Sequence, residues 1–446
     1  MSEQWRFETR QVHAGQTPDA ATGARALPIY QSTSFVFPDA QTAADRFALA
    51  DLGPIYTRIG NPTQTAVEDR IASLEGGVGA LLLASGQAAT TFAILNVAQA
   101  GDHVVASSAL YGGTYNLLKY TLSRLGIETT FIADIGDLQE WRDAIRPTTK
   151  LLFGESISNP DGKILDIAAL ADIAHEAGVP LFVDNTVATP YVLRPLEHGA
   201  DVVIHSATKY LGGHGTSIGG VIVDGGTFDY AADPDRFPQL NTPSESYHGL
   251  VFARDLGVGS ALGANLAFIL KARVELLRDL GSAISPFNAW LIQLGIETLS
   301  LRVERHLANT RRVADYLQAH DQVEKVYWSS LPDSPYADLA ARYTPLGAGA
   351  VLSFDIVGGL DAGRAFVDGC ELHSHVANIG DVRSLVIHPA STTHSQGSDA
   401  DRLGAGVTPG LVRLAVGIEH IHDILADLHR GFAAVGFADS GAARQD

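Results

Sequence analysis

Cysteine and long apolar runs are scarce in this chain of 446 residues. Its single cysteine, Cys370, excludes an intramolecular disulfide and a zinc site built from several cysteines. No run of about 18 apolar residues occurs, so we expect no transmembrane helix. The first residues lack the basic and apolar regions of a signal peptide. These absences predict a soluble, cytoplasmic protein.

Positive charge is scarce as well. The chain has 31 lysines and arginines against 50 acidic residues, a formal net charge of −19. This balance argues against nucleic acid and anionic membrane as partners, since both require basic patches. The absence of a Gly-x-Gly-x-x-Gly fingerprint and of a Walker loop counts against NAD and nucleoside triphosphates. We expect no metal site, because metal-ligand spacing is lacking among the later histidines, His373, His375, His388 and His394.

Hydrophobic patterning predicts an α/β protein. From residue 62 short apolar runs alternate with helical patterns of about 10–15 residues, which is typical of βαβ units and of a mostly parallel sheet. A long helical stretch from Ser285 to His320 and fewer strands then start a second, smaller α/β domain. We therefore expect an irregular N-terminal arm at 1–60, a large domain at 61–284 and a C-terminal domain at 285–446. The arm lacks a core of its own and must lie against the body or a partner subunit.

Lys209 is the most informative of only six lysines. It alone follows an apolar strand and precedes a glycine-rich loop, and a second apolar strand ends in Asp184. Ligands of parallel sheets bind at the carboxyl ends of the strands. An amine for a Schiff base and a carboxylate for a ring nitrogen are what pyridoxal phosphate requires from a protein. The pattern therefore predicts an enzyme with this cofactor, although Asp184 taken alone is also a plausible helix cap.

Several hydroxyls and amides suit the phosphate of such a cofactor. Ser206 and Thr208 alternate, so on an extended segment they point to the same side. Ser85 precedes a helix that begins at Gly86, and a helix N-terminus attracts a phosphate through its unpaired N–H groups. Plain capping of this helix by Ser85 is the alternative.

Four further residues each allow two interpretations. Tyr111 follows a strand beside two glycines, and it either stacks on a cofactor ring or belongs to the core. Arg413 lies inside an apolar strand and either binds a substrate carboxylate or forms a structural salt bridge. Tyr56 and Arg58 either complete a phosphate site from a neighbouring subunit or belong to a surface turn.

As an ordered set, these motifs resemble the Cys/Met-metabolism family of pyridoxal-phosphate enzymes, the trans-sulfuration enzymes, over nearly the whole chain. The resemblance implies the aspartate-aminotransferase type of fold, fold type I, and tetramers built from two dimers that share active sites. It depends on the following motifs: Tyr56-Thr-Arg58 with Gly60-Asn-Pro62, Ser85-Gly86-Gln87, Tyr111-Gly-Gly, Ser158-Asn159-Pro160, Val183-Asp184-Asn185-Thr186, Ser206-Ala-Thr208-Lys209-Tyr210 and Leu411-Val-Arg413-Leu.

The same resemblance implies a role for each motif residue. Lys209 should form the Schiff base and act as the catalytic base, and Asp184 should bind the pyridinium nitrogen. Tyr111 should stack on the ring and serve catalysis, with Asn159 near the 3-oxygen of the ring. The phosphate should be held by Gly86, Gln87, Ser206 and Thr208, with Tyr56 and Arg58 from the neighbouring subunit. The substrate should contact Arg413, Asn378 and Tyr56.

Within the family, an insertion at 238–249 and the stretches 295–306, 377–389 and 392–394 resemble the sulfhydrylase branch. This implies γ-replacement in methionine biosynthesis, in which O-acetylhomoserine and sulfide give homocysteine and acetate. The alternatives are a cystathionine γ-synthase, a cystathionine or methionine γ-lyase and, outside this class, a scaffold without activity. The residues leave open acetyl, succinyl or phosphoryl as the leaving group, and sulfide, methanethiol or cysteine as the acceptor.

Overall fold

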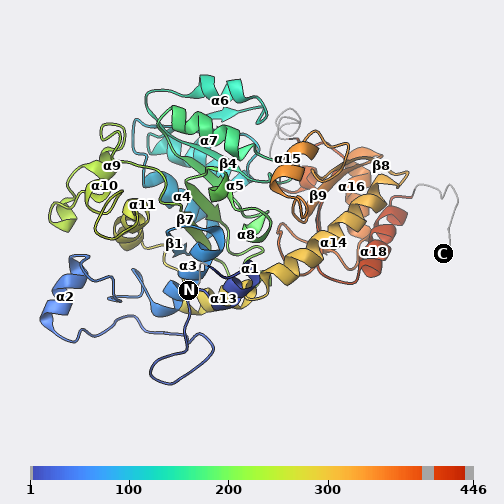
Figure 1. Ribbon diagram of the computed structural model, residues 1–446. Coiled ribbons are helices and arrows are strands. Elements are labelled where there is room, and N and C mark those ends of the chain that lie inside the picture. Colours follow the sequence, from blue (N-terminus) through green and yellow to red (C-terminus); the bar gives the residue numbers. More distant parts are fainter. Residues whose placement is uncertain (1–3, 394–405, 437–446) are drawn as a thin grey trace. The chain divides into compact units, whose positions relative to one another are not determined.

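The computed structural model describes residues 4–393 and 406–436, which form two compact units (Figure 1). The first unit contains the residues up to 157 together with 164–300, and the second contains 158–163 and the residues from 301 onward. Residue 285, the expected start of the second domain, thus lies in the first unit. The reason is close packing, because a Cβ on Gly295 would lie 2.2 Å from the carbonyl oxygen of Gly212. His394, part of the last motif above, is outside the described residues.

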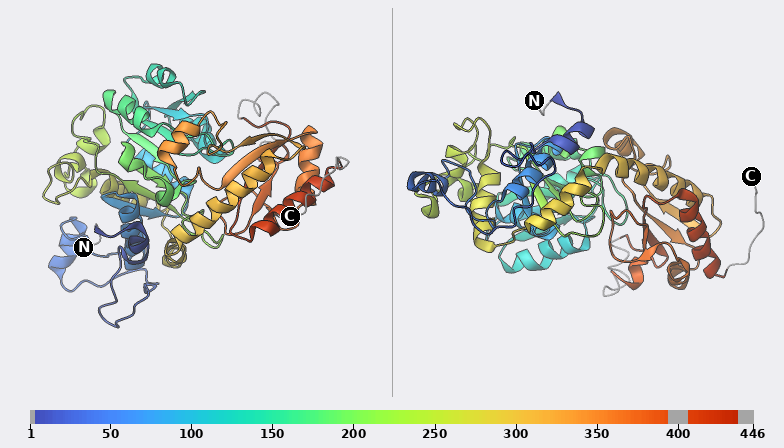
Figure 2. Two further views of the ribbon diagram at one scale, coloured as in Figure 1. Left: turned by 45° about the vertical axis from the view of Figure 1, so that its right-hand side comes forward. Right: turned by 90° about the horizontal axis from the view of Figure 1, so that it is seen from below.

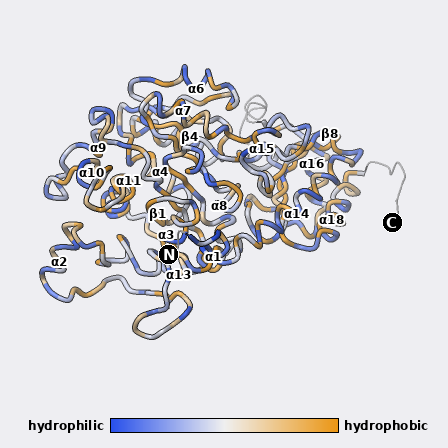
Figure 3. Tube along the Cα trace, in the orientation of Figure 1, coloured by the Kyte–Doolittle hydropathy of each residue, from blue (hydrophilic) through white to orange (hydrophobic). Residues whose placement is uncertain are grey.

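The core of the first unit is a seven-stranded sheet with the order β1-β7-β6-β5-β4-β2-β3. All neighbouring strands are parallel except β7, which is antiparallel to β1 and β6, so the expected mostly parallel sheet is confirmed. Six of the strands are almost wholly buried, whereas β3 at the edge of the sheet buries only Ile132. Figure 3 shows hydrophobic colour along the chain around β1. The strands are β1 Gly79–Leu83, β2 His103–Ser107, β3 Glu128–Ile132, β4 Thr149–Glu155, β5 Leu181–Asp184, β6 Val202–His205 and β7 Gly220–Asp224.

The helices of the first unit begin and end at recognisable signals. In α3 (Pro62–Glu75) the Asn61 side chain accepts a hydrogen bond from the Thr63 amide, proline occupies the first turn, and Gly76 ends the helix with φ of 87°. The other helices are α1 Phe7–His13, α2 Ala40–Phe47, α4 Gly86–Leu95, α5 Gly112–Asn116, α6 Leu138–Ala144, α7 Ile167–Glu176, α8 Thr189–Val192, α9 Pro238–Asn241, α10 Phe252–Asp255, α11 Ala267–Lys271, α12 Arg278–Leu280 and α13 Pro286–Ile296.

Residues 4–60 hold two short α-helices, α1 and α2, within otherwise irregular chain. Figures 1 and 2 both show the segment around α2 extending away from the sheet of its own unit. Its apolar side chains have few neighbours, and the exposed fraction reaches 93% for Val36 and 62% for Phe47. The expectation that this arm lacks a core of its own is consistent with these exposures.

The second unit is a smaller α/β structure, as expected. Its five strands have the order β10-β11-β12-β9-β8, and Phe354 of β9 packs on two helices through Phe366 and Phe432, with ring centres 5.3 and 5.9 Å away. In the described ranges no helix is long and apolar enough to cross a membrane. The elements are α14 Leu299–Gln318, β8 Val323–Tyr327, α15 Ala337–Tyr343, β9 Val351–Ile356, α16 Gly359–Gly369, β10 Ser374–His375, β11 Leu385–Ile387, β12 Leu411–Ala415 and α18 Ile421–Ala434.

Candidate functional site

The carboxyl ends of β1, β5 and β6 bring several predicted residues to one edge of the sheet. Ser85 follows β1 by two residues, Asp184 ends β5, and Lys209 follows β6 by four. All three are half-buried, whereas the strands leading to them are fully buried. A half-buried amine beside a dry sheet edge is accessible to a small ligand and is still shielded from bulk water on one side.

The start of α4 packs directly on the segment that precedes Lys209. A Cβ on Gly86 would lie 2.8 Å from the Cβ of Ser206, so only glycine permits this approach. The Ser85 hydroxyl accepts a hydrogen bond from the Ala88 amide at 3.1 Å, which leaves the amides of Gly86 and Gln87 at the helix N-terminus for another acceptor. The two phosphate elements expected from the sequence, a helix N-terminus and a hydroxyl, are thus adjacent.

Thr186 links the acidic end of this edge to the hydroxyl end. Its amide donates to Asp184 Oδ1 at 2.9 Å, and its hydroxyl oxygen accepts the Ser206 amide at 2.8 Å. Burial raises the pKa of the Asp184 carboxyl, while the Thr186 hydrogen bonds and the charge of His205 lower it. A cation such as a protonated ring nitrogen would favour the ionised form of Asp184.

The Thr208 hydroxyl is engaged with the backbone that leads into β7. It accepts a hydrogen bond from the Gly219 amide at 3.0 Å and donates to the Gly219 carbonyl at 3.1 Å. Because its proton is directed at this carbonyl, donation to a phosphate requires the hydroxyl to rotate. Next along the chain, the Lys209 carbonyl accepts the Gly213 amide at 2.7 Å, which closes the glycine-rich turn behind the lysine.

Tyr111 lies at the same edge and is held by β4. Its amide donates to Glu155 Oε1 at 2.5 Å, and Glu155 pairs with Asp184 in the register of β4 and β5. The Tyr111 ring lies against Gly113, where an added Cβ would be 2.5 Å from the ring. The side chain is 54% exposed, so the interpretation of Tyr111 as a core residue is wrong. Gln87 contacts the same turn by accepting the Thr114 hydroxyl at 3.2 Å.

In the second unit, three predicted residues meet around Arg413. Its guanidinium donates to the Asn159 side-chain oxygen and to the Asn378 backbone carbonyl, both at 3.1 Å. Asn378 contributes a main-chain atom to this contact. Two neutral oxygens therefore orient a cation whose planar fork suits a carboxylate.

Tyr56 and Arg58 make their contacts elsewhere. The Arg58 guanidinium donates to the Arg278 carbonyl and lies over the Tyr56 ring, 5.5 Å from its centre. Tyr56 is 40% exposed, and the backbone around it bridges to Ser34. Within this chain both residues belong to the arm, and a role in a neighbouring subunit stays a prediction.

Sequence reasoning missed a buried polar layer under the strand ends. Glu75 accepts hydrogen bonds from His205 and Asn185, and all three side chains are at most 1% exposed. The available signal was Glu75 itself, an acid at the end of a helix whose neighbours Ile71 and Leu74 form an apolar stripe. Glu155 was also missed, and Thr186 was quoted within a motif but was given no role.

The comparisons with known proteins agree with this geometry. Residues 8–433 match the model of the Cys/Met metabolism PLP-dependent enzymes. An O-acetyl-L-homoserine sulfhydrylase of Corynebacterium glutamicum is 55% identical over 441 residues, which cover 97% of this chain and 98% of the relative. That of Thermus thermophilus, named O-acetyl-L-homoserine sulfhydrylase 1, is 48% identical over 96% of this chain and its own whole length.

Solved structures show the same fold. A putative O-acetylhomoserine (thiol)-lyase from Campylobacter jejuni, solved with N'-pyridoxyl-lysine-5'-monophosphate, has a TM-score of 0.91 at 38% identity and covers 96% of this chain and all of its own. A cystathionine gamma-lyase from Lactobacillus plantarum has a TM-score of 0.81 at 34% identity and covers 97% of this chain and all of its own. The fold, the lysine at the sheet edge and these matches lead to one conclusion: the chain belongs to the Cys/Met metabolism family of PLP-dependent enzymes.

Proposed function

We propose that this enzyme is an O-acetylhomoserine sulfhydrylase, which replaces the acetate of O-acetyl-L-homoserine with sulfide to give L-homocysteine. The half-buried Lys209 amine, placed at the sheet edge with the start of α4 and Asp184, carries this proposal. The relatives of that name, one of them 55% identical over nearly the full length, support this substrate over others of the family.

The residues at the sheet edge fit pyridoxal phosphate. The space over Gly86 that a Cβ would fill is bordered by Ser206, and the amides of Gly86 and Gln87 provide donors for the phosphate. Asp184 provides the negative charge for the ring nitrogen, and the exposed ring of Tyr111 is available for stacking. When bound, the cofactor withdraws electrons from the α-carbon of an amino acid.

Lys209 is the base and acid in this proposal. Its amine takes a proton from the α-carbon of the substrate and then one from the β-carbon, after which acetate leaves from the γ-carbon. Sulfide adds at the γ-carbon, and the amine returns protons to the β- and α-carbons. Two protons are moved by one amine because both carbons are neighbours in the same substrate. The Gly213 amide, bonded to the Lys209 carbonyl at 2.7 Å, holds the backbone of the lysine during these transfers.

Arg413 binds the α-carboxylate of the substrate in this proposal. Asn159 Oδ1 and the Asn378 carbonyl orient its guanidinium from two sides. Replacement by lysine keeps the charge and loses the fork, so we expect Arg413→Lys to raise KM more than it lowers kcat.

The oligomeric form that we propose is a tetramer made of two dimers, in which the arm reaches the neighbouring active site with Tyr56 and Arg58. The exposed apolar side chains of the arm support this, since Val36 and Phe47 are costly to leave in water. Light scattering of the pure protein, and of a variant with Val36 and Phe47 replaced by serine, measures the mass directly.

We also propose that the enzyme works in the cytoplasm. Its one cysteine supports this, because a chain without disulfides requires no oxidising compartment. Fractionation of the source cells, followed by detection of the chain, tests the location.

The decisive experiment offers the pyridoxal-phosphate-loaded enzyme O-acetylhomoserine together with sulfide or with cysteine. We expect homocysteine from sulfide and little cystathionine from cysteine. Cysteine brings a second carboxylate, and efficient cystathionine formation would therefore assign the enzyme to the γ-synthases instead. O-succinylhomoserine and O-phosphohomoserine, tested in parallel with sulfide, identify the leaving group. Lys209→Ala is the control for turnover by free cofactor.

A further inference from the structure

Glu75, at the end of α3, joins the two strands whose ends carry Asp184 and Ser206. Its Oε1 atom accepts a hydrogen bond from His205 Nε2 at 2.6 Å and another from Asn185 Nδ2 at 3.0 Å. Glu75 and Asn185 are 0% exposed, and His205 is 1% exposed. A single buried carboxylate oxygen therefore connects the end of β5 to the end of β6.

The two residues that Glu75 contacts are sequence neighbours of two proposed cofactor residues. Asn185 directly follows Asp184, and His205 directly precedes Ser206. Successive side chains of an extended segment point to opposite sides. Asp184 and Ser206 thus lie on the cofactor side, linked through Thr186, while Asn185 and His205 lie on the buried side, linked through Glu75.

The buried side is fixed by further contacts. Asn185 Nδ2 also donates to the Leu193 carbonyl at 2.7 Å, and Asn185 Oδ1 accepts the Ser156 hydroxyl at 2.8 Å. Because Ser156 directly follows β4, the layer spans three adjacent strands. The strands β4, β5 and β6 each contact this layer at their carboxyl end, through Ser156, Asn185 and His205.

We propose that Glu75 is a positioning residue for pyridoxal phosphate, which sets the separation between Asp184 and Ser206 without touching the cofactor. This inference rests on the roles proposed above for Asp184 and Ser206. A rigid cofactor binds both ends at once only when the carboxylate and the hydroxyl keep the right separation. A substitution that weakens the hydrogen bonds of Glu75 to His205 and Asn185 should therefore weaken cofactor binding.

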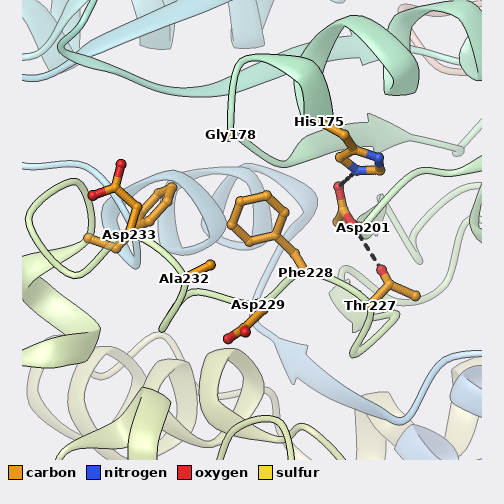
Figure 4. Close-up of a pocket in the computed structure, with 9 residues that line it drawn as sticks. His175, Gly178, Asp201, Thr227, Phe228, Asp229, Ala232 and Asp233 are labelled. Carbon is orange, nitrogen blue, oxygen red and sulfur yellow. Dashed lines mark hydrogen bonds and ion pairs between the residues drawn. The ribbon is translucent and has the colours of Figure 1, made fainter.

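A second carboxylate provides a natural control, because it joins the opposite ends of the same two strands. Asp201, directly before β6, accepts the Leu181 amide at the start of β5 at 2.9 Å and His175 Nε2 at 2.8 Å. Its other oxygen accepts the Thr227 hydroxyl at 2.9 Å, and Figure 4 shows Asp201 between these two side chains. Asp201 is 2% exposed, so its loss tests the effect of a buried carboxylate away from the cofactor edge.

The experiment compares Glu75→Gln and Glu75→Asp in the full-length enzyme. Glutamine keeps the reach of the side chain and an acceptor oxygen, whereas aspartate keeps the charge and withdraws it by about 1.5 Å. We measure the rate at which pyridoxal phosphate leaves the diluted holoenzyme and the Kd on titrating it back. We expect Glu75→Asp to raise the Kd about tenfold or more and Glu75→Gln to raise it less than about threefold.

Two matched variants make the outcome specific. Asp201→Asn should lower the unfolding temperature and leave the cofactor Kd unchanged. Asp184→Asn should raise the Kd strongly, and its failure to do so would refute the proposed site rather than the role of Glu75. With Asp184→Asn behaving as expected, an unchanged Kd in Glu75→Asp overturns the inference. A larger effect of glutamine than of aspartate also overturns it, because charge rather than position would then be decisive.

Discussion

Polar side chains gather at both edges of the seven-stranded sheet, but the two edges differ in their access to solvent. At the amino edge His103, Lys150 and Asp201 are buried and paired within the chain: His103 lies between the hydroxyls of Thr149 and Thr130 at 2.8 and 2.9 Å, and Lys150 pairs with Asp102 at 3.3 Å. At the carboxyl edge Ser85, Asp184 and Lys209 are half-buried, and Tyr111 is exposed. One sheet thus buries paired polar groups at one edge and, in the proposed site, presents polar groups to a ligand at the other.

This difference in solvent access follows from the free energy that burial of a polar group costs. A buried polar group costs several kcal/mol unless its partners are supplied by the chain, so the amino edge contributes stability and specificity of packing. At the carboxyl edge the proposed cofactor residues, above the buried Glu75 layer, lie within reach of water, which a ligand can replace. Substitutions at the first edge should therefore change unfolding, and those at the second should change cofactor binding and turnover.

Lys209→Ala should produce the largest effect on turnover. Without the amine no group at the sheet edge takes the proposed protons, and we expect kcat to fall by at least about 10³-fold. Unfolding by heat should change little, because Lys209 is half-buried and ends no strand. Steady-state kinetics and calorimetry on the same preparation measure both. A variant with most of its turnover intact would assign the base to another residue.

Asp184→Asn should produce the next largest effect, a loss of affinity for the cofactor. The substitution keeps the shape of the side chain and removes the charge that we assign to the ring nitrogen. Loss of one partner of a buried charge pair costs about 3–5 kcal/mol, so cofactor affinity should fall by a factor of about 10² to about 4,000. Titration of the stripped protein with pyridoxal phosphate measures this. Unaltered affinity would mean that the ring nitrogen has a different partner.

Much of this carboxyl edge could be predicted from the sequence. The sequence predicts an apolar strand before Lys209 and a second that ends in Asp184, and β6 and β5 confirm both. Runs this short are too brief for a buried helix and are rich in β-branched residues, which favours a strand. The residues just after those strands then had to meet at one edge. Gly86 against Ser206 is the contact that this reasoning required, and the structure contains it.

What the sequence could not reveal depends on contacts between distant parts of the chain. Glu75 reads as a solvated acid at a helix end until β5 and β6 are placed beside it. The helical patterning of 285–320 is continuous, so the sequence predicts one long helical stretch. The structure divides this stretch into two helices, α13 and α14. Strand β11 has three residues and is defined only by its pairing with β10 and β12.

Acid should lower the free energy of unfolding through the buried histidine His103 at the amino edge. Burial lowers the pKa of His103 to about 4, below its ordinary value of 6.5. The unfolded chain therefore binds this proton more readily, so stability is complete above pH 6.5 and falls as the pH drops toward 4, by up to about 3 kcal/mol. Denaturant unfolding of the wild type and of His103→Gln between pH 7 and 4 measures the difference. Equal slopes in the two proteins would show that His103 titrates alike in both states.

His175, at the same edge, should act with the opposite sign and the smallest magnitude. Its hydrogen bond to Asp201 raises the pKa of His175 above the ordinary value of 6.5. A raised pKa in the folded state means that the stabilisation is complete below pH 6.5 and is lost as the pH rises through the folded pKa. The imidazole is 42% exposed, so water screens the pair and we expect about 0.5 kcal/mol. His175→Gln should flatten the decline in stability between pH 6 and 8 while leaving cofactor affinity unchanged, since His175 is bonded to the amino ends of β5 and β6 through Asp201 and not to their cofactor ends. If His175→Gln changed the affinity for pyridoxal phosphate, the two edges of the sheet would be coupled. Stability and cofactor binding would then not be separate properties of the amino and carboxyl edges.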